Sequence, residues 1–446
     1  MQLFQNMRNI LDIILGWPSI IFVFSISIAC TFVFCFVQFR YFFKAWKYTL
    51  FPEKSTEKTT GKVDMTPFQA FVMTLSANIG NGSLAGMATA IYSGGPGAAF
   101  WVVVSGFIMM SVRYAEVFLS AYVALQRKTK SAIGGPMLYL KLVPGGKYLA
   151  YMYAVSCVLL GFFMGNAMQT NSIGLAAFTT WGISPLTISL ISFVFIIFVM
   201  FGGAKRIVQF SDFVMPIKVG LFILLSFTLL IYHWQNIIPS LILIFKSAFS
   251  SQAMAGGALG FSVQQAMRFG LLRGIAATES GLGTAAILFS STSSKDPVKT
   301  GLMSILTTFI STCVCLIIAL CIVASGAHTT GLTSTALTIS AFSTVFGQFA
   351  GWAVNFLSIM FGVGVIISFA YIFREMWAYI TGGRFMGLCS VVYCIGSFCG
   401  PLMTPDFVFM ISDMVVVSML IINLIGVVYL LPLMKKELKA FEKQQG

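Results

Sequence analysis

Long apolar runs recur along the whole chain and are separated by short polar stretches. A helix that crosses a bilayer needs about 20 mostly apolar residues, and each run is close to that length or longer. The runs cover residues 19–37, 68–92, 97–125, 147–170, 184–202, 213–233, 259–290, 301–325, 352–373, 386–400 and 408–433. The pattern therefore predicts eleven candidate transmembrane helices.

Two of these runs are interrupted by polar and glycine-rich stretches. Residues 78–83 read Asn-Ile-Gly-Asn-Gly-Ser, and glycines at 270, 274, 281 and 283 surround Glu279. Glycine in a helix interior costs about 1 kcal/mol, so both helices are predicted to unwind midway. Unwound backbone is tolerated within a membrane only where it faces protein or water. The alternative is close packing of straight helices through Gly82 and Gly86, but it leaves the polar residues and Glu279 unexplained.

The two interruptions open two blocks of five predicted helices each. The blocks start on opposite sides of the membrane, since an odd number of helices separates their starts. This is the inverted-repeat pattern of secondary transporters, in which broken helices form the binding site. The predicted divisions are an extra helix and basic linker at 1–67, a first repeat at 68–233, a second repeat at 234–433 and a basic tail at 434–446.

The composition supports a membrane protein. Hydrophobic residues make up 58% of the chain and charged residues only 9%, against about 25% charged residues in a soluble domain. This excludes a soluble enzyme, a disordered chain and a disulfide-stapled secreted module. The nine cysteines lie in apolar stretches and form no CxxC pair, and the two distant histidines do not make a metal site. The fold class is therefore all-α polytopic membrane protein.

The net charge of +14 is explained by loops facing the cytoplasm, not by nucleic acid, because Lys and Arg collect in cytoplasmic loops. With the N-terminus outside, only Arg8 and Lys246 fall in outside loops, and Arg113, Lys218, Arg268 and Arg273 lie within or at the ends of segments. The inside loops and the tail hold Arg40, Lys44, Lys47, Lys54, Lys58, Lys62, Arg127, Lys128, Lys130, Lys141, Lys147, Lys205, Arg206, Lys295, Lys299, Arg374, Arg384, Lys435, Lys436, Lys439 and Lys443. The N-terminus is predicted outside and the C-terminus in the cytoplasm.

The interrupted stretches carry recognisable motifs. Residues 76–86, Ser-Ala-Asn-Ile-Gly-Asn-Gly-Ser-Leu-Ala-Gly, resemble the first-helix signature of the alanine or glycine:cation symporter family. Residues 274–283, Gly-Ile-Ala-Ala-Thr-Glu-Ser-Gly-Leu-Gly, resemble that family's NEAGMG-type motif. Stretches at 134–137, 165–172, 202–207, 246–249 and 255–257 are similar to the family as well. The resemblance implies a leucine-transporter fold of ten core helices plus one N-terminal helix.

Three departures from the family pattern fall where substrate and cation would bind. The family usually has Gly-Thr-Gly-Asn where this chain has Gly80-Asn81-Gly82-Ser83, and Asn-Glu where it has Thr278-Glu279. In the eighth core helix the family carries a Trp, and ungapped counting from Glu375 places Ala370 there. A Trp buries on the order of 150–250 Å². We therefore expect a pocket that accepts amino acids beyond alanine and glycine, unless a neighbouring aromatic side chain fills the space or the alignment slips.

Candidate site residues follow from the needs of a zwitterionic amino acid. Its carboxylate suits free backbone N–H groups where a half-helix begins. Its ammonium needs carbonyl oxygens, which a stretch predicted to be unwound at 276–278 would offer, and a sodium ion needs oxygen ligands as well. The expected substrate-binding residues are Gly80, Asn81, Gly82, Asn166, Gln169, Ala276, Ala277, Thr278 and Ala370. The expected cation ligands are Asn78, Ser83, Thr278 and Ser368. For Asn166 and Gln169 the alternative is hydrogen bonding between helices, worth under about 1 kcal/mol each.

Charged residues inside the segments are candidates for structural and gating roles. A carboxylate in a spanning segment is expensive and marks function by default. Glu279 either contacts ligand or accepts hydrogen bonds from unwound backbone amides. Arg113 and Glu116 are three residues apart and share a helical face, so we expect a structural pair near the cytoplasmic interface. Arg268 and Arg273 flank the second interruption and either gate it through a salt bridge or snorkel.

The predicted function is secondary active transport of small neutral amino acids such as alanine or glycine, by alternating access. Na⁺ is the expected coupling ion, with H⁺ as the alternative, and we expect no cofactor, no nucleic acid and no obligatory protein partner. The expected location is a bacterial plasma membrane, with the lipid bilayer as the surroundings. A channel and an intramembrane enzyme are the rival functions, but two inverted halves favour alternating access, and no nucleophile–base pair is visible.

Overall fold

The computed structural model describes residues 16–51, 65–126, 134–249, 263–292 and 296–445. The described residues are helical throughout, apart from loops and one isolated bridge between Met65 and Thr292. Several basic residues of the predicted inside loops, among them Lys54, Lys58 and Lys62, lie outside the described residues, as do Arg8 and the stretch 127–133 that follows the second core helix.

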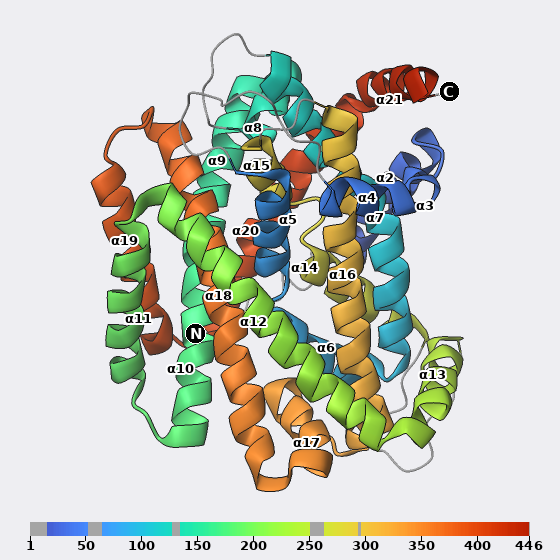
Figure 1. Ribbon diagram of the computed structural model, residues 1–446, viewed down its shortest axis with the longest axis vertical. Coiled ribbons are helices and arrows are strands. Elements are labelled where there is room, and N and C mark those ends of the chain that lie inside the picture. Colours follow the sequence, from blue (N-terminus) through green and yellow to red (C-terminus); the bar gives the residue numbers. More distant parts are fainter. Residues whose placement is uncertain (1–15, 52–64, 127–133, 250–262, 293–295, 446) are drawn as a thin grey trace.

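Each of the eleven predicted segments corresponds to a helix or a pair of half-helices (Figure 1). Nine segments are continuous or nearly so, because their apolar runs contain few helix-breaking residues. They are α2 (Trp17–Val33), α7 (Gly97–Gln126), α9 with α10 (Gly146–Phe162 and Met168–Trp181), α11 (Pro185–Met200), α12 (Gly203–Tyr232), α16 (Pro297–Ala324), α18 (Ala350–Thr381), α19 (Met386–Cys399) and α20 (Pro405–Tyr429). Two are broken: α5 (Pro67–Asn78) with α6 (Asn81–Gly94), and α14 (Val263–Thr278) with α15 (Thr284–Ser290).

Six helical stretches are long and apolar enough to cross a membrane by length and composition, among the described residues. They contain α7, α9 with α10, α12, α16, α17 with α18, and α20. The helices α2, α11 and α19 are shorter apolar helices. The four half-helices of the two broken segments are too short to cross alone, with α5 spanning 12 residues and α15 spanning 7. Each broken pair therefore has to act as one interrupted spanning segment.

Several helices were not predicted because they are too short or too polar to read as spanning segments. Helices α13 (Trp234–Phe249) and α17 (Ser334–Phe346) lie at one end of the molecule (Figure 1). At the other end lie α4 (Phe42–Leu50), α8 (Pro136–Tyr139) and α21 (Leu431–Gln445). The predicted basic tail is thus a helix, whose apolar side buries Met434, Leu438 and Phe441. Short helices α3 (Val37–Arg40) and α4 precede the linker, and Arg40 pairs with Glu442 at 3.0 Å.

The charge pattern predicts that the basic segments gather on the cytoplasmic side, and this topology stays a prediction. The helices α3 and α21, which carry basic residues, lie toward one end, whereas α13 and α17 lie toward the opposite end (Figure 1). We expect reporter fusions placed after Arg127 and after Gly331 to report the cytoplasm and the exterior, respectively. Alkaline phosphatase and green fluorescent protein fusions would measure this. Equal reports from both positions would contradict the helix count.

The first broken helix runs through the middle of the packing. Its half-helix α5 contacts α12, α16 and α18, and its half-helix α6 contacts α14, α16 and α17. Helix α7 packs along α14, α15 and α16 and is buried along most of its length. Both breaks are therefore surrounded by other helices, as unwound backbone in a membrane requires.

Candidate functional site

The first break lies within the predicted stretch 78–83 and is two residues long. Helix α5 ends at Asn78, Ile79 and Gly80 leave the helical conformation, and α6 begins at Asn81. Gly80 is extended, with φ −124° and ψ −172°, and its carbonyl accepts the first hydrogen bond of α6 from the Ser83 amide at 2.8 Å. No side chain caps α6, so its first backbone N–H groups form an uncapped positive end in the middle of the molecule.

Three buried amide side chains meet at this break. Each of them has at least one polar atom without a hydrogen-bond partner among the described residues. Asn78 and Asn81 are each 5% exposed and Gln169 is 3% exposed. The unpartnered atoms are both amide atoms of Asn78, Nδ2 of Asn81 and Oε1 of Gln169. The Gln169 oxygen faces Gly80, since a Cβ there would lie 3.7 Å from it. Buried polar atoms without partners are rare and costly, so this cluster is the strongest candidate for a ligand site.

Helix α18 closes one side of the first break. Ser358 donates a hydrogen bond to the Asn81 side-chain oxygen at 2.8 Å. A Cβ on Gly80 would come within 2.6 Å of the Val365 side chain, and a Cβ on Gly362 within 3.1 Å of Asn81 Nδ2. Glycine is needed at position 80 because α18 approaches the backbone this closely.

Arg273 of α14 covers the opposite side, on the first turns of α6. A Cβ on Gly82 would lie 3.2 Å from its guanidinium, and one on Gly86 would overlap it. The Arg273 guanidinium also lies beside the Cys315 thiol, and the Ser83 side chain lies beside this thiol as well. No carboxylate lies within salt-bridge distance of Arg273 among the described residues. The predicted salt-bridge gate is thus absent at Arg273 in this conformation, and Arg268 lies over the Phe269 ring, 5.7 Å from its centroid.

The second break starts three residues later than predicted, at Glu279 and not at Ala276. Ala276, Ala277 and Thr278 belong to the last turn of α14, and the non-helical stretch runs from Glu279 to Gly283. Positive φ angles at Glu279 (50°), Gly281 (90°) and Gly283 (80°) produce the break, and glycine takes that conformation at little cost. The prediction of unwound backbone at 276–278 is wrong, because alanine favours helix. Their carbonyls nevertheless lie at a helix C-terminus, where carbonyl oxygens lack helical partners.

Glu116, from the middle of α7, holds the second break in place. One of its carboxylate oxygens accepts hydrogen bonds from the amides of Gly281 at 3.1 Å and Gly283 at 3.0 Å. Asn423 of α20 donates to the same oxygen at 3.2 Å and to the Gly281 carbonyl at 2.8 Å. The role considered for Glu279, accepting bonds from unwound amides, belongs instead to Glu116. Glu279 accepts a hydrogen bond from the Thr284 hydroxyl at 3.0 Å.

The predicted pair of Arg113 and Glu116 is confirmed, whereas its position near the cytoplasmic interface stays a prediction. The two side chains are 2.9 Å apart and fully buried. Arg113 also donates to the Thr278 carbonyl, the last of α14, and to the Thr308 hydroxyl at 3.4 Å. The pair therefore lies at the second break, where the Thr278 carbonyl at the end of α14 and the amides of the unwound stretch supply partners for the two charges.

The contacts described for some other predicted site residues do not place them at either break. Asn166 lies in a π-helical turn (Phe163–Ala167) and bonds to α19, donating to the Tyr393 carbonyl at 2.6 Å and accepting from Ser397 at 2.7 Å. Ser368 donates to the Gly364 carbonyl of its own helix at 3.0 Å. Ala370 is fully buried, five residues beyond Val365. Their functional roles stay predictions.

Sequence reasoning assigned no role to one residue at the first break. Lys218 of α12 is fully buried and donates hydrogen bonds to the carbonyls of Ser76 and Ile79, both at 2.8 Å. The sequence feature that could have pointed to Lys218 is its position inside a predicted spanning segment, since a lysine within a membrane is by default a candidate functional residue.

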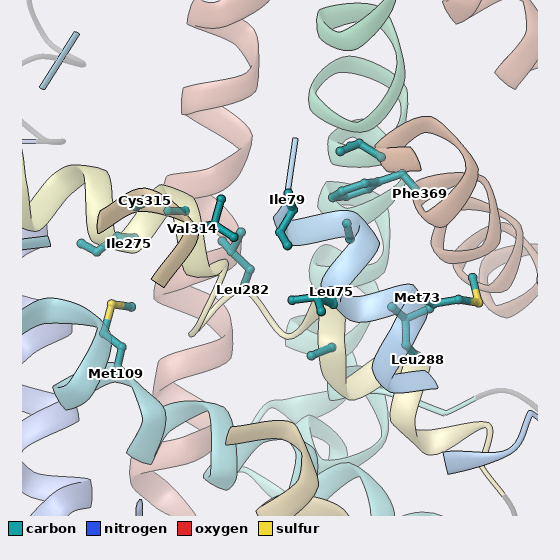
Figure 2. Close-up of a cluster of buried hydrophobic side chains, with 14 of the residues drawn as sticks. Met73, Leu75, Ile79, Met109, Ile275, Leu282, Leu288, Val314, Cys315 and Phe369 are labelled. Carbon is teal, nitrogen blue, oxygen red and sulfur yellow. The ribbon is translucent and has the colours of Figure 1, made fainter. Parts of the chain in front are cut away.

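The two breaks share one buried cluster. Figure 2 shows Ile79 of the first break and Leu282 of the second among the same hydrophobic side chains, with Val314 and Cys315 of α16 beside them. The start of α6 and the end of α14 thus face a common interior region. A positive helix end and a negative helix end near each other suit the two charged groups of an amino acid.

Comparison with known proteins agrees with this geometry. The chain is 31% identical over 393 residues to the sodium/alanine symporter AgcS of Methanococcus maripaludis, covering 86% of each chain. It is 28% identical over 456 residues to the probable sodium/glutamine symporter GlnT of Bacillus subtilis, covering 98% of this chain and 92% of that one. It is 30% identical over 430 residues to an uncharacterised transporter of Haemophilus influenzae, covering 96% and 93%.

A solved structure shares the fold. It is a Na⁺-coupled sialic acid symporter in a substrate-bound outward-open state, with a TM-score of 0.53 and 12% sequence identity, covering 92% of this chain and 80% of that one. The expected leucine-transporter-like fold is consistent with this match. The sequence profile of the sodium:alanine symporter family matches residues 1–446. The chain therefore belongs to the sodium:alanine symporter family and is a secondary transporter, not a channel or an enzyme.

Proposed function

We propose that this transporter couples the entry of Na⁺ to the uptake of a small neutral amino acid such as alanine, across a bacterial plasma membrane. Alanine and glutamine are named for the relatives AgcS and GlnT, and family membership implies sodium coupling. The observation that carries the proposal is the pair of broken helices whose free ends face one buried region.

The substrate carboxylate binds the backbone N–H groups at the start of α6, around Gly80, Asn81 and Gly82. The absence of side chains at the two glycines lets a carboxylate reach these groups, and the helix end favours a negative charge. The substrate ammonium binds the carbonyls at the end of α14, at Ala276 and Ala277. Ala276 is exposed although its neighbours are buried, so this turn is reachable from outside the packed core.

Na⁺ binds oxygen ligands beside the first break. A hard cation prefers carbonyl, hydroxyl and amide oxygens. Asn78 supplies an amide oxygen without a partner among the described residues, and Ser83 supplies a hydroxyl whose bond to the Asn78 carbonyl is long, at 3.5 Å. Both lie within one helical turn of the substrate position, so cation and substrate stabilise each other's binding.

The two predicted five-helix blocks, 68–233 and 234–433, form an inverted repeat that moves by alternating access. The broken pair α5 with α6 opens the first block, and the broken pair α14 with α15 is the first spanning segment of the second. Rocking of one bundle against the other around such breaks exposes the site to each side in turn. The N-terminus lies outside and the C-terminus in the cytoplasm, as the charge pattern predicts.

Purified protein in proteoliposomes should accumulate labelled alanine when an inward Na⁺ gradient is present. Uptake should saturate with alanine and stop when an ionophore collapses the gradient, because the gradient is the energy source. Competition by unlabelled glycine, glutamine and larger amino acids measures the size of the pocket. We expect larger amino acids to compete, and Ala370→Trp to narrow their range. Uptake that does not depend on the Na⁺ gradient would contradict sodium coupling. If only alanine and glycine compete for uptake, the prediction of an enlarged pocket is wrong.

A further inference from the structure

The Lys218 side chain ends at the C-terminal end of α5. Its ammonium nitrogen lies 2.8 Å from the carbonyl oxygens of Ser76 and of Ile79, the residue at which the first break begins. It also lies over the Phe361 ring of α18, 5.7 Å from the ring centroid. Two carbonyl oxygens and an aromatic face are the surroundings that a cation prefers.

No acidic side chain accompanies this lysine. Among the described residues, no carboxylate lies within salt-bridge distance of Lys218, although lysine is almost never fully buried unless it is paired. The partial negative charge at the C-terminus of α5 takes the place of a counter-ion. A protein that needed only to cap a helix could do so with a neutral donor at lower cost, because burying a charge is expensive.

The space around the ammonium is closed by α18. A Cβ on Gly364 would come within 2.5 Å of the Lys218 nitrogen and 2.9 Å of the Ser76 hydroxyl. The Ser76 hydroxyl donates to the Gly364 carbonyl at 3.1 Å. The ammonium thus lies between the broken helix, α12 and α18, at a position bounded by backbone carbonyls.

We propose that the Lys218 ammonium occupies a cation position at the first break, so that the protein supplies a tethered cation there in place of a free Na⁺. An ammonium and a sodium ion bind the same carbonyl oxygens, so the two exclude each other. A tethered cation is not transported, and the coupling ion must then bind elsewhere, beside Asn78 and Ser83. The inference rests on the proposed cation-coupled function but concerns ion occupancy, which can be measured without transport.

The test measures Na⁺ binding by the melting temperature of the purified full-length protein in detergent, with choline replacing Na⁺ at constant ionic strength. Lys218→Ala and Lys218→Ser vacate the space and free both carbonyls. Lys218→Met removes the charge but fills the space. Lys246→Met, on the exposed side of α13, is the matched control. A ligand that binds only the folded state raises the free energy of unfolding. Above the dissociation constant, each tenfold rise in ligand concentration adds the same increment.

We expect Lys218→Ala and Lys218→Ser to gain a Na⁺-dependent rise in melting temperature beyond that of the wild type. Lys218→Met and Lys246→Met should show no such gain. Equal Na⁺ responses of the wild type and both vacated variants would overturn the proposal and make Lys218 a structural cap. Failure of both vacated variants to give monodisperse protein even at high Na⁺ would also count against it, since Na⁺ should replace the ammonium. Absence of alanine uptake by the wild type would contradict the proposed function while leaving this result intact.

Discussion

Glu116→Ala should abolish transport and strongly destabilise the protein. The substitution removes the acceptor for the amides of Gly281 and Gly283 and leaves the buried Arg113 without its ion-pair partner. Breaking a buried ion pair from one side costs about 3–5 kcal/mol, and each unsatisfied buried amide adds about 1–3 kcal/mol. The expected result is a large fall in melting temperature and no measurable alanine uptake from the fraction that inserts.

Two further variants separate charge from hydrogen bonding at this position. Glu116→Gln keeps one acceptor oxygen for the amides and should lose less stability than Glu116→Ala. Glu437→Ala, in α21, changes a carboxylate far from the breaks and should leave alanine uptake near the wild-type level. A Glu116→Ala protein with wild-type melting temperature and uptake would show that the second break does not depend on Glu116.

Gly82→Leu should abolish alanine uptake and leave the protein inserted. The new side chain would start 3.2 Å from the Arg273 guanidinium and extend over the first N–H groups of α6, where the substrate carboxylate is proposed to bind. Losing two hydrogen bonds to a charged group, at about 1.5–3 kcal/mol each, lowers affinity by a factor of about 100 or more. Binding of labelled alanine to purified protein and uptake into proteoliposomes both measure this loss.

Gly220→Leu is the matched control for that substitution. Gly220 lies on the exposed side of α12, and a Cβ there would have no atom within 4 Å. It makes the same change in a helix without touching either break, so uptake should stay near the wild-type level. Normal uptake by a well-expressed Gly82→Leu variant would remove the start of α6 from the binding site.

Much of this arrangement could be predicted from residue patterns alone. Runs of apolar residues are local signals that can be recognised without knowing any tertiary partner, so the eleven segments correspond to helices or broken pairs. The first break follows from a local cause as well, since glycines at 80 and 82 next to asparagines at 78 and 81 disfavour helix within an apolar segment. Helices α13 and α17 were missed because their 16 and 13 residues fall short of the length that marks a spanning segment.

The partners of the charged residues were decided only by the tertiary structure. Glu116 and Gly281 are separated by 165 residues along the chain, and nothing in either local pattern says which carboxylate accepts the unwound amides. The sequence suggested Glu279 because it is the acid within the break. Its backbone is the turn itself, with φ 50°, whereas Glu116 approaches from α7 at a distance suited to two amides.

The amino-acid sequence by itself determined the class of protein, the number of interrupted segments and the place of the first break, because hydrophobic length and glycine content act locally. The tertiary structure decided which side chains complete each break: Gln169 and not Asn166 at Gly80, Glu116 and not Glu279 at Gly281, and Lys218 at the end of α5. A buried charge or amide pairs with an unsatisfied backbone group only when the two lie within about 3 Å of each other. That proximity depends on how helices far apart in the chain pack together.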